Sequence, residues 1–185
     1  NTSASMAAYA ANAGLKAVVF VPEGEISMGK LSQALAYGAQ VIQVKGLFDD
    51  AMRIIKESSR QLGLYVLNSL NPWRIEGQKS IVFEALQQMR WSPPDWIVLP
   101  AGNLGNTSAF GKALKELNQL GLLENVPHIA SVQAEGADPF YRLWRGKHNS
   151  LEPVDAHTVA SAIQIGNPVS WMKAIESIRF TDGEV

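Results

Sequence analysis

The sequence predicts an α/β fold built from parallel sheets with helices on both faces. Short apolar runs rich in β-branched residues alternate with segments of helical periodicity along the 185 residues. The connections between them are short, which is typical of parallel strand–helix–strand units. The apolar runs are continuous rather than alternating, as expected for strands that helices cover on both sides.

The first 71 residues contain three helix signals and three strand signals. Apolar faces with helical spacing predict helices that end near Gly14, Gly38 and Gly63. Apolar runs predict strands at residues 17–21 (AVVFV), 40–45 (QVIQVK) and 64–68 (LYVLN). The composition changes within residues 68–77, which predicts a smaller lobe over residues 1–71 and a larger lobe over residues 72–185.

The larger lobe continues the alternation. Pro93-Pro94-Asp95 separates its first helix from its first strand, and Gly121 ends the next helix. The predicted strands are residues 96–99 (WIVL) and 129–133 (IASVQ). Helical spacing of apolar residues predicts helices over residues 81–89, 110–121 and 169–178.

Composition excludes several classes of function. Sixteen basic and seventeen acidic residues give a net charge of −1 without a basic cluster, so we expect no nucleic-acid partner. The apolar runs are too short to span a bilayer, so we expect no membrane partner. There is no cysteine, which suits a cytoplasmic setting, and the three histidines lack metal-ligand spacing. We therefore expect no metal site.

The stretch LPAGNLGNTSA, residues 99–109, is the strongest candidate for a binding site. A buried strand ends, a loop rich in glycine and asparagine follows, and a helix opens at about Thr107. Such a loop presents main-chain N–H groups at the positive end of a helix dipole, which suits an anion. Gly102 and Gly105 would allow close approach, and Asn103 and Asn106 tolerate left-handed backbone. An ordinary strand-to-helix turn capped by Thr107 or Ser108 is the open alternative.

A second glycine-containing stretch imitates a nucleotide-binding loop. Residues 24–31 (GEISMGKL) fit G-x-x-x-x-G-K-[ST] at every position except the last. Leu31 cannot ligate magnesium, and Glu23 and Glu25 would place carboxylates beside a triphosphate. We interpret the stretch as a solvated loop.

A third polar cluster follows the predicted strand 64–68. Ser69, Asn71 and Arg74 stand close together in the segment NSLNPWRIEGQK, which the pattern predicts to be a loop stiffened by Pro72. Arg74 could grip a carboxylate or a phosphate with two hydrogen bonds. From the sequence alone, a surface pair between Arg74 and Glu76 is the favoured interpretation.

These stretches together resemble one enzyme family. The resemblance rests on NTSASMAAYAANAGL, PEG…GKLSQALAYGAQVIQV, VLNSLNPWRIEGQKS, LPAGNLGNTSAFGKAL and IGNPVSW, which span essentially the whole chain. They resemble the threonine synthases, pyridoxal-phosphate enzymes of the tryptophan synthase β-like group, or fold type II. The resemblance implies the two-lobed architecture of that group, pyridoxal 5'-phosphate as cofactor, and conversion of O-phospho-L-homoserine and water into L-threonine and phosphate.

The resemblance also implies roles for individual residues. Asn1 would bind the phenolic oxygen of the cofactor ring, and Thr2 and Ser3 would bind the substrate carboxylate. Arg74 would face the substrate phosphate, which reverses the surface-pair interpretation. Two further residues, Ser69 and Asn71, would join it there. The cofactor phosphate would lie against Gly102, Asn103, Leu104, Gly105, Asn106 and Thr107.

The family's catalytic lysine has no match in this sequence. In the family that Schiff-base lysine lies upstream, in a Lys-Asp-Arg context before the first asparagine motif, and none of the lysines here has that context. We therefore expect no catalytic residue in this segment, and expect activity from the parent enzyme, for which a homodimer is left open. Two alternatives also stay open: a threonine or serine dehydratase of the same group, and a non-catalytic α/β module that binds a phosphorylated ligand.

Overall fold

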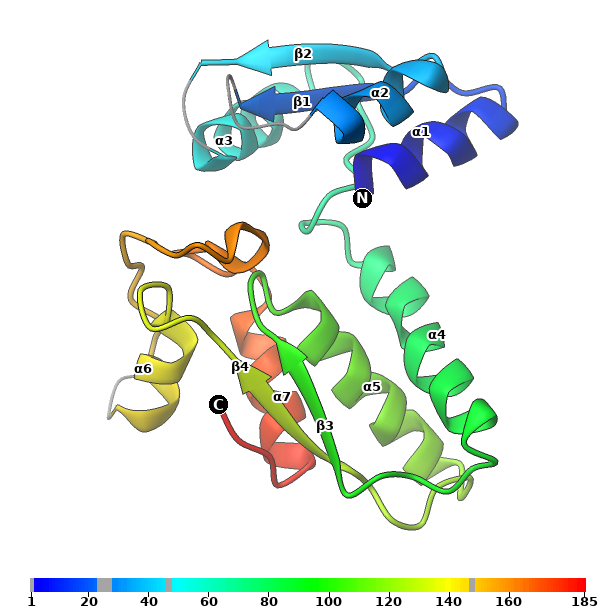
Figure 1. Cartoon of the computed structure of the whole chain (residues 1–185), viewed down its shortest axis with the longest axis vertical. Coiled ribbons are helices and arrows are strands. Elements are labelled where there is room, and N and C mark those ends of the chain that lie inside the picture. Colours follow the sequence, from blue (N-terminus) through cyan, green and yellow to red (C-terminus); the bar gives the residue numbers. More distant parts are fainter. Residues whose placement is uncertain (1, 23–27, 46–47, 147–148) are drawn as a thin grey trace. The chain divides into compact units, whose positions relative to one another are not determined.

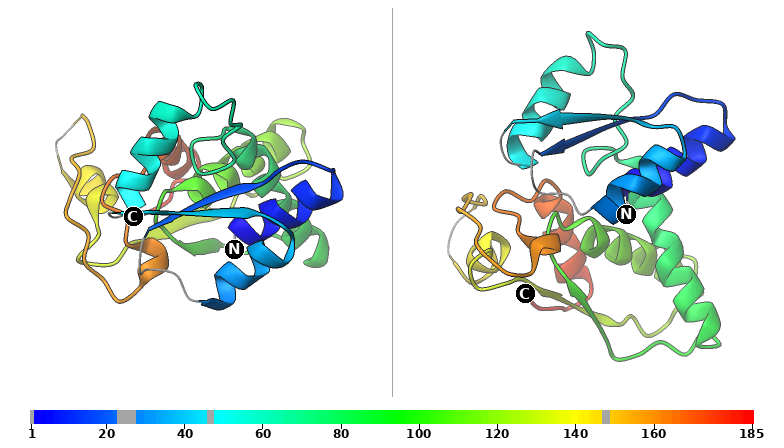
Figure 2. Two further views of the ribbon diagram at one scale, coloured as in Figure 1. Left: turned by 90° about the horizontal axis from the view of Figure 1, so that it is seen from above. Right: turned by 45° about the horizontal axis from the view of Figure 1, so that its top comes forward.

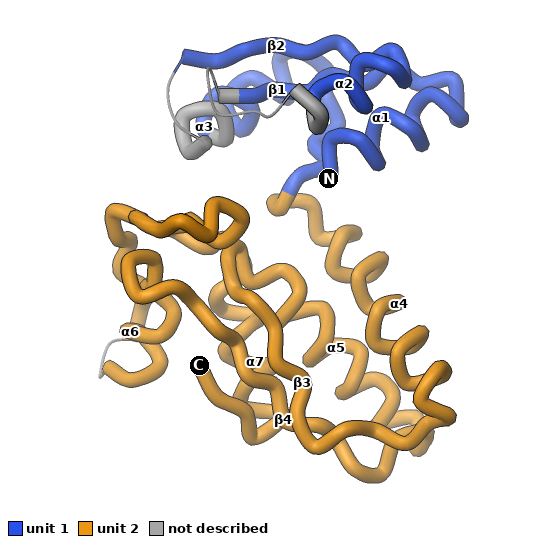
Figure 3. The backbone as a smooth tube through the Cα atoms, viewed as in Figure 1, with its two compact units in different colours: residues 1–68 blue, residues 69–185 orange. Residues whose placement is uncertain are grey.

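Two compact units make up the chain, residues 1–68 and residues 69–185 (Figure 3). The computed structural model describes residues 2–22, 28–45, 48–146 and 149–185, without the side chains of residues 22, 28–30 and 48–52. Each unit combines helices with a two-stranded parallel sheet. The predicted α/β class and the parallel pairing are therefore confirmed.

The first unit pairs two strands through a crossover helix. Its elements are α1 (Thr2–Asn12), β1 (Val18–Pro22), α2 (Met28–Ala36), β2 (Gln40–Val44) and α3 (Phe48–Ser58) (Figure 1). β1 and β2 pair in parallel, with Val18 opposite Gln40 and Pro22 opposite Val44. A parallel pair needs such a crossover because the chain must return to the same end of the sheet. The core consists of small and branched side chains: Ala7, Ala17, Val19, Val21, Ala34 and Ala39.

The predicted strand at residues 64–68 is wrong. These residues form no strand, and Tyr65 and Leu67 are exposed. An apolar, β-branched run favours an extended chain, but a strand also needs a neighbour that completes its hydrogen bonds. In the described part of the first unit, β1 is paired with β2 alone.

The second unit holds the other sheet and the longer helices. Its elements are α4 (Trp73–Gln88), β3 (Trp96–Pro100), α5 (Gly105–Gln119), β4 (His128–Val132), α6 (Pro139–Arg145), the 3₁₀ helix η1 (Ser161–Ile163) and α7 (Trp171–Phe180). β3 and β4 pair in parallel, with Trp96 opposite His128. A bridge between Ala130 and Glu184 brings the last residues beside β4.

α5 is the central helix of this unit. It packs against both α4 and α7, as the views in Figures 1 and 2 show. Its buried side chains join a core that includes Leu86, Leu99, Leu114, Ile129, Phe140 and Ile178. This packing fixes the amino-terminal end of α5 at the carboxyl end of β3, where α/β sheets commonly bind ligands.

α4 begins earlier than the sequence predicts. The segment from Trp73 to Lys79, interpreted above as loop, forms the first turns of the helix. Pro72 has φ of −64°, which suits a helix start, and the Oδ1 atom of Asn71 accepts a hydrogen bond from the N–H of Trp73 at 3.0 Å. Gly77 lies inside the helix without ending it. No helix within the described ranges is long and apolar enough to cross a membrane.

Candidate anion-binding site

The loop between β3 and α5 presents main-chain donors at a helix start. The first helical hydrogen bond runs from the N–H of Ser108 to the carbonyl of Leu104, at 3.1 Å. No acceptor among the described residues bonds the N–H groups of Gly105, Asn106 and Thr107. The helix dipole adds partial positive charge at the same place. The loop is therefore suited to an anion with several acceptor oxygens.

Leu104 gives this loop its concave shape. Its φ of 63° and ψ of 16° lie in the left-handed region, which is uncommon for a leucine. A left-handed residue followed by right-handed ones turns successive N–H groups toward one point. The side chain of Leu104 is 2% exposed and belongs to the hydrophobic core, which holds the backbone in place. Asn103 and Asn106, which tolerate left-handed backbone, do not adopt it here, because neither has a positive φ.

Hydrogen bonds to β4, to Ser170 before α7, and within the loop itself fix its shape. The hydroxyls of Thr107 and of Ser131 on β4 are 2.8 Å apart, and both side chains are buried. The hydroxyl of Ser108 donates to the carbonyl of Leu104 at 2.8 Å, and the N–H of Ser170 donates to the carbonyl of Asn103 at 3.3 Å. The donors are therefore held in position before any ligand arrives.

Gly102 has a packing role in the structure. A Cβ atom on this residue would lie 3.3 Å from the carbonyl oxygen of Ala162 and from the Cα of Ile163, tighter than an ordinary contact. The 3₁₀ segment therefore packs against the backbone of Gly102. Close approach explains this glycine, although the close neighbour is the chain itself.

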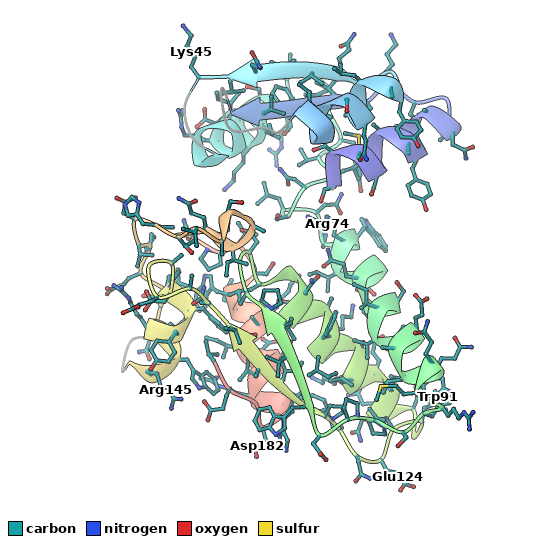
Figure 4. The ribbon with its side chains drawn as sticks, viewed as in Figure 1. Lys45, Arg74, Trp91, Glu124, Arg145 and Asp182 are labelled. Carbon is teal, nitrogen blue, oxygen red and sulfur yellow. The ribbon has the colours of Figure 1, made fainter. Side chains whose placement is uncertain are left out.

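The other polar residues singled out in this unit surround the start of α4. Ser69 is half-buried and Asn71 is 8% exposed, with its amide oxygen committed to the N–H of Trp73. Arg74 lies in the first turn of α4 and is half-buried (Figure 4). Burial lowers the pKa of its guanidinium below the usual value for arginine.

The surface pair between Arg74 and Glu76 is not formed. Glu76 instead pairs with Lys112 and with Lys79, the latter at 2.7 Å, and Lys79 also pairs with Glu116 at 2.6 Å. Hydrogen bonds from Lys112 and Lys79 lower the pKa of Glu76 from 4.5 to about 2. These charges balance one another. Within the described part of the chain, Arg74 has no carboxylate partner.

The remaining predicted residues belong to the first unit. Thr2 and Ser3 form the first turn of α1 and line a cavity of about 540 Å³ that Asn68 also lines. Asn1 lies outside the described residues, as do residues 24–27 of the nucleotide-loop imitation. The described residues contain no group of three or more acidic or histidine side chains that could hold a metal.

Sequence reasoning missed Ser131 and Ser170. Both lie far along the chain from the loop, and they contact it only because β4 pairs with β3 and α7 packs on α5. A single serine at the centre of the apolar run IASVQ was the signal for Ser131, since a buried hydroxyl needs a partner.

This fold and loop belong to a family of cofactor-dependent enzymes. Residues 1–185 match the family model described as pyridoxal-phosphate dependent enzyme, and the chain belongs to that family. It is 46% identical to a threonine synthase of Methanocaldococcus jannaschii over 184 residues, which are 99% of this chain and 45% of that protein. It is 42% identical to threonine synthase 2, chloroplastic, of Arabidopsis thaliana over 187 residues, 36% of that protein. The chain thus spans less than half the length of these relatives.

Solved structures share the fold at lower identity. Maize serine racemase matches 99% of this chain over 53% of its own, with a TM-score of 0.75 and 20% identity. Processed threonine deaminase isoform 2 from Solanum lycopersicum matches 96% of this chain over 49% of its own, with a TM-score of 0.78 and 19% identity. These similarities show the fold.

Proposed function

We propose that the chain is part of a threonine synthase, which converts O-phospho-L-homoserine and water into L-threonine and phosphate. The observation that carries this proposal is the set of N–H donors on Gly105, Asn106 and Thr107. Identity of 41–46% to threonine synthases over nearly the whole chain supports this reaction. The racemase and the deaminase share the fold at only 20% and 19% identity.

The loop fits the phosphate group of pyridoxal phosphate. Its donors are main-chain N–H groups, and a phosphate monoester offers acceptor oxygens and negative charge to them. The hydroxyl of Thr107 is bonded to Ser131, so we assign Thr107 a contact through its N–H. When bound, the cofactor supplies an electron sink for charge that develops on the substrate. We assign the phosphate to Gly102, Asn103, Leu104, Gly105, Asn106 and Thr107, and the ring oxygen to Asn1.

The start of α4 is the proposed site for the substrate phosphate. Arg74 is a half-buried cation with no carboxylate partner in the described part of the chain, so a phosphate would restore the interactions that burial removes. The Oδ1 atom of Asn71 accepts a hydrogen bond from the N–H of Trp73, and we assign its side-chain amide to the substrate phosphate as an N–H donor. Ser69 would add a hydroxyl donor. Thr2 and Ser3, in the first turn of α1, would bind the substrate carboxylate.

The finer architecture follows from the same proposal. The two units would be parts of the smaller and larger lobes of the fold type II enzymes, with boundaries near residue 71 and helices on both faces of each completed sheet. A cytoplasmic location and a homodimer stay predictions, and one relative is named chloroplastic.

The test uses the full-length protein that carries this chain. We expect threonine and inorganic phosphate from O-phosphohomoserine. Arg74→Met should lower kcat/KM by about 10- to 100-fold through KM, the loss typical of a hydrogen bond to a charged group. Arg179→Met, an exposed arginine at the end of α7, is the matched control and should leave kcat/KM unchanged. Ammonia and an oxo acid from threonine would support a dehydratase instead, and ligand binding without turnover would support the non-catalytic module.

A further inference from the structure

Gln78 places a buried acceptor beside the first residue of α5. It lies on α4, and its Oε1 atom is buried without a hydrogen-bond partner. A Cβ atom on Gly105 would lie 3.4 Å from this oxygen, so the carboxamide touches the loop that carries the free N–H groups. Folded proteins rarely leave a buried polar atom unpaired, and such an atom calls for a ligand or another explanation.

Gln78 lies on α4 between the two predicted anion contacts, Arg74 and the loop at the start of α5. Gln78 follows Arg74 by four residues, so both side chains lie on the same face of the helix. Gln78 contacts the start of α5 while Arg74 lies one turn nearer the start of α4. Lys79, its neighbour in sequence, is held by Glu76 and Glu116 and is committed elsewhere.

A carboxamide can serve this place in two orientations. Its oxygen accepts and its nitrogen donates, and half a turn about the last side-chain bond exchanges them. In the structure the oxygen is buried beside Gly105 and bonds none of the N–H groups of the loop. With an anion on those donors, the exchanged amide would present an N–H to the anion and remove the unpaired oxygen from its buried position.

We propose that Gln78 is a further binding residue of the loop, which donates a hydrogen bond from Nε2 to a phosphate monoester held by the N–H groups of Gly105, Asn106 and Thr107. The proposal rests on the function proposed above, because it takes the same loop as a phosphate site. Gln78 adds a donor without adding charge. A glutamate of the same length would instead add an acceptor and a negative charge.

Two substitutions separate binding from a structural role. Gln78→Met keeps the length and helix propensity of the side chain and removes the unpaired oxygen. We expect it to fold at least as stably as the wild type and to bind inorganic phosphate and pyridoxal 5'-phosphate about 10- to 100-fold more weakly. Gln78→Glu should weaken both at least as much. Gln87→Met, at an exposed position on the same helix, is the control and should bind as the wild type does.

These affinities are measured by calorimetric titration of the whole chain with inorganic phosphate and with pyridoxal 5'-phosphate. Pyridoxal, which lacks the phosphate group, is the comparison ligand. If the wild type binds phosphate and Gln78→Met binds it with the same affinity, the role of Gln78 is overturned while the phosphate site stands. No phosphate binding by the wild type would overturn the phosphate site as well. Should Gln78→Met fail to fold, the side-chain amide resonances of Gln78 decide in the wild type. A saturable shift with phosphate supports the proposal, and no shift overturns it.

Discussion

The buried pair of Thr107 and Ser131 allows the structural and binding roles of the loop to be separated. The two hydroxyl oxygens are 2.8 Å apart, and the side chains are 0% and 1% exposed. Thr107→Val keeps the shape of the side chain and strands the hydroxyl of Ser131. An unsatisfied buried hydroxyl costs about 1–3 kcal/mol, so each of Thr107→Val and Ser131→Ala should destabilise by roughly that amount. The double variant should lose about 1 kcal/mol less than the sum, because no partner is left stranded.

Tryptophan fluorescence during urea unfolding is the assay for this cycle. All five tryptophans lie between Trp73 and Trp171, so the signal reports on the second unit alone. With a typical slope of about 1–3 kcal/mol per molar urea, a loss of about 2 kcal/mol moves the midpoint by roughly 1 M. Phosphate affinity of Thr107→Val should stay within about twofold, because the N–H and not the hydroxyl is the donor. Additive losses in the cycle, or loss of phosphate binding in a folded Thr107→Val, would refute this reasoning.

Three further predictions follow from the same unit. Gly111→Ala would bring a Cβ within 2.2 Å of the side chain of Ser177 and force α5 and α7 apart. The free energy of unfolding should fall by about 1–3 kcal/mol, and the urea midpoint should fall with it. Gly77→Ala, inside α4 with open space around it, is the control and should raise the midpoint. The pKa of Glu76 is lowered to about 2, so its ion pairs stabilise the fold above pH 4.5 and are lost as the pH falls toward 2. The difference in Tm between the wild type and Glu76→Gln should therefore vanish over that pH range. A difference in Tm that stays constant would contradict the stabilising role of these ion pairs. Leu104→Gly should lose about 1 kcal/mol less free energy of unfolding than Leu104→Ala in the same urea assay, because glycine adopts the left-handed backbone without strain. A larger loss in Leu104→Gly would contradict strain at this residue.

Local pattern was enough to predict most of the fold. The strands at 17–21, 40–45, 96–99 and 129–133 form close to their predicted positions because each is a β-branched, apolar run between turn signals. Gly14 and Gly121 have φ of 66° and 69°, as expected of glycines that end helices. The run at 64–68 has the same composition and fails, since pairing depends on a neighbour that no local pattern specifies.

The α6 helix escaped prediction for a related reason. It is short, and the Oε1 atom of Gln133 accepts hydrogen bonds from the N–H groups of Phe140 and Tyr141 at its start. The only local signal was Asp138-Pro139, a common helix opening. A cap supplied from another segment is invisible until the chain is folded.

The candidate site was predictable in outline and not in detail. Glycine and asparagine after a buried strand located the loop, and helix-dipole physics gave its preference for anions. The left-handed residue could not be assigned because core packing of the Leu104 side chain selects it. Gln78 was overlooked because Pro72 and Gly77 made its segment read as a loop, which hid that it shares a helix face with Arg74.

The most direct test of the account follows the main-chain amides at the start of α5. In the isotope-labelled chain titrated with inorganic phosphate, the N–H resonances of Gly105, Asn106 and Thr107 should move together and saturate with one dissociation constant. Resonances that stay in place for these three residues while others move would show that the anion binds elsewhere, and would contradict the phosphate site.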